Sequence, residues 1–534
     1  EIPAARSAAA GAAGSADQRI NSFGIGGQIT LRAGSLTQTV PIASGVVHLG
    51  LGTRTAADLL YIEWPNGVAQ AEFEQAADAE TVALQRLKGS CPWLFAEGAE
   101  GMAFVTDILW RSPLGLRINA VDTAGVVQTE DWVNLAPEQL TASDGRYHLA
   151  ITAELWETHF FDRVALKVVD PPTGLLPLVD ERFAIPPPPL ALQPLGPLLP
   201  LSAAQDQDGR DAGAAIAEED GRYLDGFALG DYQGIARPHW LELDLSADLA
   251  RLAAQEGRAE AELRPVLVAG GWIYPTDSSI NVAIGQGKRA APQALQLQVP
   301  DGAGGWKDAG PPQGFPAGKR KTLLLDLAGL GPAGGLPSRL RLSTNLEVYW
   351  DRLALAARRP EAELLVQDLT AETAELRYRG FSVTSHFGSA GPAPRSAPEL
   401  PDYERLSALH PQWIDLGGFY TRFGAVDELL AKTDDRYAIL NAGDEIRLSF
   451  VAPPPPPPGW TRRFVFVSDG WEKDGDFNTA YGGTVLPLPS HDQPGYADPV
   501  VSGPVGALED DPIYQRYPAD WQDYHTRYLP PQRR

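Results

Sequence analysis

Two stretches of the chain repeat one another in the same order, and this repeat constrains the fold more than any other feature. The segment "VTDILWRSPLGLRIN", followed later by "ETHFFDRVAL", is echoed by "PTDSSINVAIGQG", followed later by "LEVYWDRLAL". Thr106-Asp107 corresponds to Thr276-Asp277, and Phe160-Phe161-Asp162-Arg163 corresponds to Tyr349-Trp350-Asp351-Arg352. The shared order predicts two copies of one β-sandwich module.

The glycine and proline content agrees with a β architecture. The 534 residues include 54 Gly and 47 Pro, and both residues are disfavoured inside helices and common in turns. A length prior of roughly 150 residues per domain predicts three or four domains. We therefore expect a mainly β chain: a small β domain followed by two or three β-sandwich modules, the last with short helices.

Composition shifts along the chain predict where these units begin and end. The prolines of 185–213 cannot donate to a sheet and hold the chain extended, which predicts a stiff linker. The segment "VFVSDGWEKDGDFNTA" partly echoes "VLVAGGWIYPTDSSINVA", so a third, embellished copy of the sandwich is an open alternative. The expected units are a flexible segment 1–19, a β domain 20–75, a sandwich 81–184, the linker 185–213, a second sandwich 214–360, and a mixed module 361–534 with an aromatic C-terminal tail.

The net charge disfavours two classes of partner, and the cysteine content excludes an internal disulfide. A formal net charge of −24 opposes nucleic acid and anionic lipid surfaces, because both require a basic footprint. No apolar run is long enough to span a bilayer. The single cysteine, Cys91, cannot form an internal disulfide, and a small buried thiol is the favoured interpretation over a catalytic one. The chain starts at Glu1 rather than Met, which suggests a processed chain or a fragment.

The glycine-rich stretch "NSFGIGGQITLRAG", residues 21–34, resembles the start of a phosphate-binding loop but fails its pattern. The third glycine of a dinucleotide loop is replaced by Ile29, and a helix is needed there. Residues 28–32 alternate polar and apolar, which predicts a half-buried strand. We expect the glycines to form a turn that enters this strand.

Three blocks in this region carry a family resemblance. They are N-x-F-G-I-G-G at 21–27, "VVHLGLG" at 46–52 and "IEWPNG" at 62–67, and together they resemble the ASPIC and UnbV domain of cartilage acidic protein and many bacterial surface proteins. The resemblance covers about the first 75 residues and implies a secreted, extracellular or periplasmic bacterial protein. In that family an FG-GAP propeller with calcium-binding loops precedes this domain. No such repeat is present here, so the resemblance does not imply that this chain binds calcium as the propeller does. The later modules also resemble galactose-binding-like jelly rolls.

Aromatic residues are the main candidates for ligand binding. The chain has 13 Trp, and exposed aromatic rings on β-sandwiches stack on sugars, whereas buried ones fill cores and domain seams. Trp110, Trp272 and Trp471 lie near loop or strand ends and are the candidate carbohydrate-binding residues; Trp306 is placed similarly. Core and interface packing is the favoured interpretation of all of them.

Oxygen ligands at alternate positions suggest a calcium site. Asp474, Asp476 and Asn478 have the i, i+2, i+4 spacing that begins a calcium loop. The loop is incomplete, because its sixth position is not glycine and its twelfth is Val485. A polar turn is the favoured interpretation; calcium is the alternative, and no cofactor is required.

Other polar clusters have weaker patterns. Glu157, His159 and Asp162 suggest a metal site, but the repeat has Val348 where His159 stands, which favours aromatic packing. The adjacent Ser490-His491-Asp492 suits a turn rather than a catalytic triad. The segment "GFPAGKRKT" has one residue too few between its glycines for a phosphate loop, and we expect a basic hairpin loop before a strand.

These observations predict a non-enzymatic structural or interaction protein of the cell surface. It would act as a subunit or scaffold of an extracellular assembly, with other protein subunits as partners. The alternative is a carbohydrate-binding protein that uses loop-end aromatic residues of its sandwiches to bind glycans. A hydrolase with its site between domains is a third reading, which a deep polar pocket lined by two carboxylates at a domain seam would favour.

Overall fold

The fold was analysed in a computed structural model of the 534-residue chain. The structure describes residues 24–64, 69–81, 83, 91–119, 121–230, 232–287, 290–386, 397–408, 415–476, 478–493, 496 and 506–531. The expected flexible segment 1–19 lies outside these residues. The chain is mainly β, with several antiparallel sheets and a few short helices, which confirms the predicted class.

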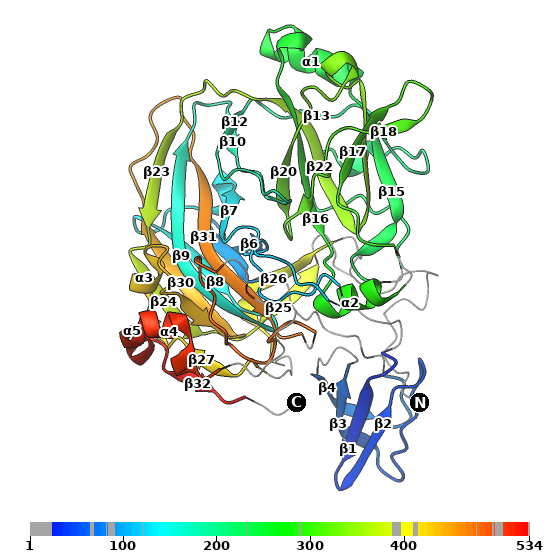
Figure 1. The fold of residues 1–534 in the computed structure, drawn as a ribbon, viewed down its shortest axis with the longest axis vertical. Coiled ribbons are helices and arrows are strands. Elements are labelled where there is room, and N and C mark those ends of the chain that lie inside the picture. Colours follow the sequence, from blue (N-terminus) through cyan, green and yellow to red (C-terminus); the bar gives the residue numbers. More distant parts are fainter. Residues whose placement is uncertain are drawn as a thin grey trace.

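A small four-stranded sheet forms first. Its antiparallel order is β2-β1-β3-β4, and it lies beside the two larger bodies at the bottom of Figure 1. Gly24 and Gly26, with φ of 65° and 101°, form the predicted turn before β1. A Cβ on Gly24 would lie 3.0 Å from the ring of Trp64, so glycine allows these two motif blocks to pack together. The strands are β1 (Gln28–Ala33), β2 (Leu36–Pro41), β3 (Ala56–Glu63) and β4 (Ala69–Ala76).

The first large body is a sandwich of two sheets. One sheet has the order β28-β24-β30-β8-β5-β6, and the other has the order β23-β9-β31-β7 with β29 also paired to β9. Leu94 and Ile151 of the first sheet share one buried cluster with Leu166 and Phe466 of the second. We call this body the outer sandwich. Its strands are β5 (Trp93–Gly98), β6 (Gly101–Asp107), β7 (Glu130–Leu135), β8 (Arg146–Thr152), β9 (Glu157–Asp170), β23 (Leu365–Thr370), β24 (Thr373–Tyr378), β28 (Gly424–Ala425), β29 (Ala438–Leu440), β30 (Asp444–Val451) and β31 (Arg463–Asp474).

The second body, here the inserted sandwich, lies wholly between β9 and β23 of the outer one. Its two sheets have the orders β13-β22-β16-β20 and β14-β15-β21-β17-β18, and Leu267, Leu353, Leu241 and Leu342 share its core. Its strands are β13 (Leu199–Pro200), β14 (Ala204–Asp206), β15 (Ile235–Asp244), β16 (Pro265–Ile273), β17 (Gln296–Pro300), β18 (Trp306–Asp308), β20 (Lys321–Asp326), β21 (Arg339–Leu346) and β22 (Val348–Ala357), with helices α1 (Ser246–Glu256) and α2 (Ser278–Gln286).

This topology differs from the expected sequence of separate modules. Strands from 81–184 and from 361–534 pair with one another, as β9 does with β31 and β8 with β30. The two stretches therefore form one sandwich rather than a first and a third. The reason is that strands within 81–184 are too few to cover both faces of a core, and the missing strands return only after the inserted sandwich is complete.

The repeat itself is visible as two matching strand pairs. β9 pairs with β31 through a register shift between Asp469 and Gly470, and β22 pairs with β16 through a shift between Gly270 and Gly271. Trp471 lies opposite Phe160, as Trp272 lies opposite Tyr349. The echo of "ETHFFDRVAL" in "LEVYWDRLAL" and that of "VFVSDGW" in "VLVAGGW" thus mark the central strands of two sandwiches. The predicted match of Thr106-Asp107 with Thr276-Asp277 is wrong, because the first pair ends the edge strand β6 and the second precedes helix α2.

The predicted linker 185–213 is not a separate spacer. Its first part belongs to a packed layer between the sandwiches that spans residues 176–195, and its later part supplies β13 and β14 of the inserted sandwich. Leu178 and Leu195 lie against β16, β20 and β22 of the inserted sandwich, whereas Val179 and Leu192 lie against β9 and β31 of the outer one. Short pairs hold the layer, β10 (Leu176–Leu178) with β12 (Gln193–Leu195) and β11 (Arg182–Phe183) with β19 (Phe315–Pro316). Figure 1 shows β10 and β12 above β7, between the strands of the outer sandwich and β20 of the inserted one. We call this layer, with the faces on either side of it, the seam.

The aromatic C-terminal segment packs on the outer sandwich. β32 (Arg527–Leu529) pairs with β27 (Gly418–Tyr420), and Ile513 and Trp521 are buried in a cluster with Trp471. Three short helices precede β32: η5 (Leu508–Asp510), α4 (Pro512–Arg516) and α5 (Pro518–Asp523). The remaining short elements are β25 (Ser382–His386), β26 (Glu399–Leu406), α3 (Asp427–Leu430), η1 (Pro137–Gln139), η2 (Gly213–Ala215), η3 (Glu260–Glu262) and η4 (Pro332–Gly334). None of the described helices is long and apolar enough to cross a membrane.

Candidate functional site

The three candidate sugar-binding tryptophans lie in cores and in the seam. Trp272 and Trp471 are 1% and 2% exposed, so neither presents a ring face to a sugar. Trp272 stacks on Tyr349 with ring centres 5.1 Å apart. Trp110 follows β6 of the outer sandwich yet packs against the core of the inserted one. The structure thus places them as packing residues, because each covers apolar surface that the matching strand pairs or the seam must bury.

The candidate calcium residues form a contact between the two sandwiches. Asp476 is buried, and the Ser279 hydroxyl on α2 donates to its two carboxylate oxygens at 2.8 and 3.0 Å. Asn478 donates through Nδ2 to the Ser279 oxygen at 2.8 Å. The Asp476 carboxylate and the Asn478 amide thus hold α2, while Asp474 Oδ1 accepts the Asp476 N–H at 2.8 Å within the turn. We refer to this contact as the α2 latch.

The cluster at Glu157, His159 and Asp162 divides into two parts. Glu157 Oε2 and His159 Nε2 lie 2.9 Å apart, and both side chains are buried. Asp162 lies beside the register shift between β9 and β31. Its carboxylate accepts backbone N–H groups of the loop at 434–435. The Cys91 backbone N–H donates to Glu157 Oε1 at 3.1 Å. Burial raises the pKa of the Cys91 thiol well above its usual value, which agrees with the predicted buried, unreactive thiol.

The segment "GFPAGKRKT" precedes a strand, β20, as expected, and its lysines lie in the seam. Lys319 Nζ is 3.5 Å from Asp107 Oδ2, and the Lys321 ammonium donates to the Asp107 carbonyl at 2.6 Å. A Cβ on Gly318, whose φ is 114°, would lie 2.2 Å from Asp107 Oδ1. Only glycine allows the two sandwiches to approach this closely here.

A polar cleft opens where the sandwiches and the proline layer meet. Its volume is about 630 Å³, within the range of small-molecule sites. The outer sandwich contributes β6, β7, η1 and the start of β31, and the inserted sandwich contributes β20 and β22. The cleft is lined by Val105, Thr106, Asn134, Leu135, Ala136, Pro137, Glu138, Gln139, Pro177, Leu178, Glu181, Glu219, Arg320, Thr322, Arg352, Arg463 and Phe464. We call it the seam cleft.

Three arginines, Arg320, Arg352 and Arg463, give the seam cleft its chemical character. Arg352 Nη1 lies 3.0 Å from Glu219 Oε2. In the described part of the chain Arg463 forms no ion pair. Burial and the neighbouring Arg352 lower the pKa of Arg463, while Glu138 acts in the opposite direction. Arg352 and Arg463 thus both line the cleft, and each has an acidic side chain as a neighbour, Glu219 and Glu138 respectively.

The carboxylate of Glu181 is not presented to the seam cleft as a free acid. It is 3% exposed, and its two oxygens accept backbone N–H groups of Asn134 at 3.0 Å and Thr322 at 2.8 Å. Burial raises the pKa of Glu181 to about 7. This residue joins β7 to β20 across the seam.

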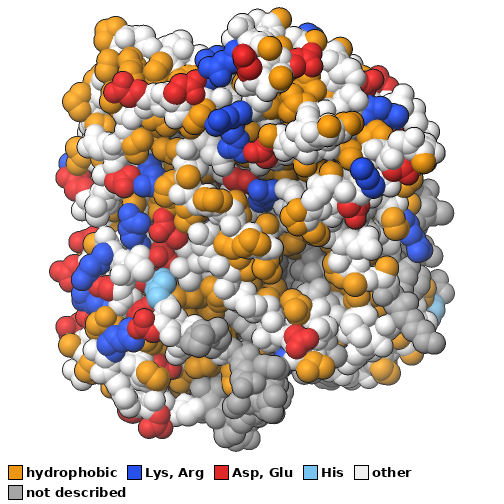
Figure 2. Space-filling model, turned by 45° about the horizontal axis from the view of Figure 1, so that its top comes forward, with side chains coloured by type: hydrophobic (Ala, Val, Ile, Leu, Met, Phe, Trp, Pro, Cys, Tyr) orange, Lys and Arg blue, Asp and Glu red, His pale blue; other side chains and the backbone are white. Residues whose placement is uncertain are grey.

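The surface around these bodies carries mixed charge. Figure 2 shows acidic and basic side chains interspersed over the face in view, with apolar ones between them. The net charge of −24 is therefore not gathered into one acidic patch on this face, and local contacts decide what binds there.

Comparison of the chain with known proteins identified no relative. No protein-family description, curated protein or solved structure matched the chain.

The arginines of the seam cleft were missed at the sequence level because their spacing is long. Arg352 and Arg463 are brought together only by the return of the chain into the outer sandwich. One signal was present: Arg352 belongs to the repeated aromatic-Asp-Arg motif, where Arg163 is its counterpart.

Proposed function

We propose that the protein is a non-enzymatic binding protein that holds an acidic saccharide in the seam cleft. The observation that carries the proposal is the presence of Arg320, Arg352 and Arg463 on one cleft of about 630 Å³. A guanidinium group binds a carboxylate or a sulfate through two parallel hydrogen bonds. Polar groups such as Thr106 and Glu138 line the same space and suit sugar hydroxyls, which both donate and accept hydrogen bonds.

The arrangement favours binding over hydrolysis. A glycosidase needs one carboxyl group that protonates the leaving oxygen and a second that acts on the other face of the sugar. Glu181 has the raised pKa of such an acid, but both of its oxygens already accept backbone N–H groups. Glu219 is paired with Arg352, and Glu138, the third carboxylate on the cleft, interacts with Arg463. We therefore expect a bound saccharide to remain uncleaved.

A glycan array of neutral, uronate-containing and sulfated oligosaccharides tests the proposal. We expect the protein to retain acidic glycans only, and Arg463→Gln to weaken retention by roughly 10-fold or more, as for loss of a charge-assisted contact. Arg341→Gln is the matched control, because Arg341 pairs with Glu242 away from the cleft. Retention of neutral glycans alone, or an unchanged signal for Arg463→Gln, would contradict the proposal.

A role at the cell surface is a second proposal, and the resemblance of residues 21–67 to the ASPIC and UnbV domain favours it. As a bacterial surface protein, the chain would act as a subunit of an extracellular assembly. Cell fractionation tests the location, and purification of the native protein tests the assembly. Recovery from the cytosol as a monomer would contradict both.

A further inference from the structure

The repeat offers an internal comparison around Asp162 and its counterpart Asp351. Each aspartate lies beside the register shift of its strand pair. Asp162 Oδ2 accepts the backbone N–H groups of Asp434 and Asp435, both at 3.0 Å. Asp351 Oδ1 accepts those of Asp220 and Gly221 at 3.2 and 3.1 Å.

The loops that cross over these aspartates also match. One reads Asp434-Asp435-Arg436-Tyr437 and the other reads Asp220-Gly221-Arg222-Tyr223. Tyr437 contacts the ring of Trp471 edge-on, as Tyr223 contacts the ring of Trp272. In the inserted sandwich, the hydrogen bonds from one loop to one aspartate are therefore sufficient to fix the loop beside the register shift.

The outer sandwich adds acidic residues where the inserted one has glycine. Asp435 replaces Gly221 and keeps a left-handed backbone, with φ of 64° against 78°. Asp469 replaces Gly270 at the register shift. A side chain at a left-handed position is strained relative to glycine, so the fold itself does not favour Asp435. The added carboxylates point to a role beyond the shared architecture.

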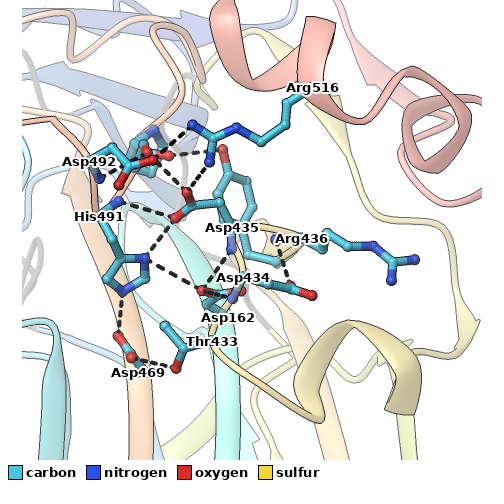
Figure 3. A network of polar contacts seen from close by, with 12 residues as sticks. Asp162, Thr433, Asp434, Asp435, Arg436, Asp469, His491, Asp492 and Arg516 are labelled. Atoms are coloured by element: carbon cyan, nitrogen blue, oxygen red, sulfur yellow. Dashed lines mark hydrogen bonds and ion pairs between the residues drawn. The ribbon is translucent and has the colours of Figure 1, made fainter.

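His491 completes the cluster from the segment before α4 (Figure 3). Its Nδ1 lies 2.6 Å from Asp435 Oδ1 and 3.6 Å from Asp162 Oδ2, while its Nε2 lies 3.1 Å from Asp469 Oδ1. One ligand-type atom each of Asp162, Asp435 and His491 lies within 4.8 Å of the others. The Thr433 hydroxyl donates to the second oxygen of Asp469 at 2.8 Å.

The cluster gathers three carboxylates around one imidazole. The carboxylates of Asp162, Asp435 and Asp469 are all buried. The cations beside them are His491 and Arg516, and Arg516 Nη1 lies 2.8 Å from Asp435 Oδ2. Asp162 Oδ1 is buried and has no hydrogen-bond partner among the described residues. A buried carboxylate oxygen without a donor is costly, and a cation shared by both oxygens of Asp162, of which Oδ2 lies 3.6 Å from His491 Nδ1, would lower that cost.

We propose that Asp162, Asp435 and His491 form a binding site for a divalent transition-metal cation of the zinc type. One imidazole nitrogen with two carboxylates is a ligand set that Zn²⁺ accepts. The cation takes the place of the proton on His491 Nδ1, and that proton is released to solvent. Asp469 is then the positioning residue, because its hydrogen bond from Nε2–H orients the ring toward the metal. This site is separate from the seam cleft and does not depend on the saccharide.

Zinc titration of the full chain by calorimetry tests the site, with Mn²⁺ and Ca²⁺ as parallel probes. We expect one Zn²⁺ per chain, with affinity reduced about 100-fold by Asp162→Asn or His491→Gln and about 10-fold by Asp469→Asn. Asp162→Asn keeps an oxygen for the two backbone N–H groups, so it tests the site where His491→Gln fails to fold. His148→Gln, on β8, is the control and should bind as the wild type does.

Arg516→Gln separates a metal site from a purely structural ion network. The guanidinium competes with the cation for Asp435, so its removal should strengthen Zn²⁺ binding about 10-fold. A structural network predicts no Zn²⁺ binding in any variant. Absence of Zn²⁺ binding to the wild type, binding that Asp162→Asn leaves unchanged, or binding of Ca²⁺ alone would overturn the proposal.

Discussion

His525 holds the C-terminal segment on the outer sandwich in a way that acid should loosen. The side chain is 3% exposed, its ring lies 4.3 Å from that of Trp521, and its Nδ1 is 3.0 Å from the Thr421 hydroxyl. Burial lowers the pKa of His525 from 6.5 to about 3, against a smaller opposite effect of Asp520. The folded protein therefore keeps this imidazole neutral, whereas the unfolded chain takes up a proton below pH 6.5.

The stability loss follows from this difference. A histidine whose folded pKa is depressed destabilises the fold as pH falls from 6.5 toward 3, because the unfolded state binds more protons. At about 1.4 kcal/mol per pH unit, the loss reaches about 2 kcal/mol at pH 5. His525→Phe keeps the contact with Trp521 and removes the titration, but it gives up the hydrogen bond to Thr421, at about 1 kcal/mol.

We therefore expect the stabilities of wild type and His525→Phe to cross between pH 7 and pH 5. The wild type should be the more stable by about 1 kcal/mol at pH 7, and the variant by about 1 kcal/mol at pH 5. Urea unfolding at the two pH values, with hydrogen exchange of β27 and β32 as a local probe, measures this. Trp521→Phe keeps the histidine and should keep the wild-type pH slope. A pH-independent difference between wild type and His525→Phe would refute the reasoning.

Four further substitutions test the packing. Trp272→Ala and Trp471→Ala should each lower the free energy of unfolding by about 3–5 kcal/mol, measured by urea unfolding, and unchanged stability would mean that the rings are not buried. Gly318→Ala should lower the unfolding midpoint, because its Cβ would meet Asp107; Gly304→Ala, with φ of 94° and no atom within 4 Å, is the control for backbone strain alone. Ser279→Ala should cost about 1–3 kcal/mol, because it removes the hydroxyl that donates to the buried Asp476 and leaves the Asn478 N–H as a donor to Oδ1. Adding Ca²⁺ to the wild type should not change the unfolding midpoint if the turn is only a latch.

The mainly β class and the individual repeated strands could be predicted, because both depend on local pattern. The repeated aromatic-Asp-Arg run and the Gly-Trp run appear in the sequence as they do in β9, β22, β16 and β31. The turn at 24–27 and the strand after it were predicted from glycine placement and alternation. These features need no knowledge of distant residues.

The joining of the strands could not be predicted in the same way. Nothing in a local pattern states that β9 pairs with β31, some 300 residues later in the sequence, rather than with a nearer strand. The linker 185–213 was expected to be a spacer, because proline content reveals stiffness and not that β12, β13 and β14 within it pair with other strands. The seam cleft and the cluster at His491 depend on these distant pairings and were missed for the same reason.

The matching loops at 434–437 and 220–223 were a signal that sequence comparison offered. Alignment of the two copies through the Asp-x-Arg-Tyr run would have placed Asp435 opposite Gly221. An acidic residue at a position where the other copy has glycine marks a departure from the shared fold, and such departures are where function is expected.

The central claim is that the seam cleft binds an acidic saccharide through its arginines. A crystal structure of the protein grown with an oligouronate tests it most directly. The account predicts a sugar carboxylate bound by Arg352 and Arg463, with the glycosidic bonds intact. A saccharide bound elsewhere on the molecule, with the cleft free of it, would contradict the account.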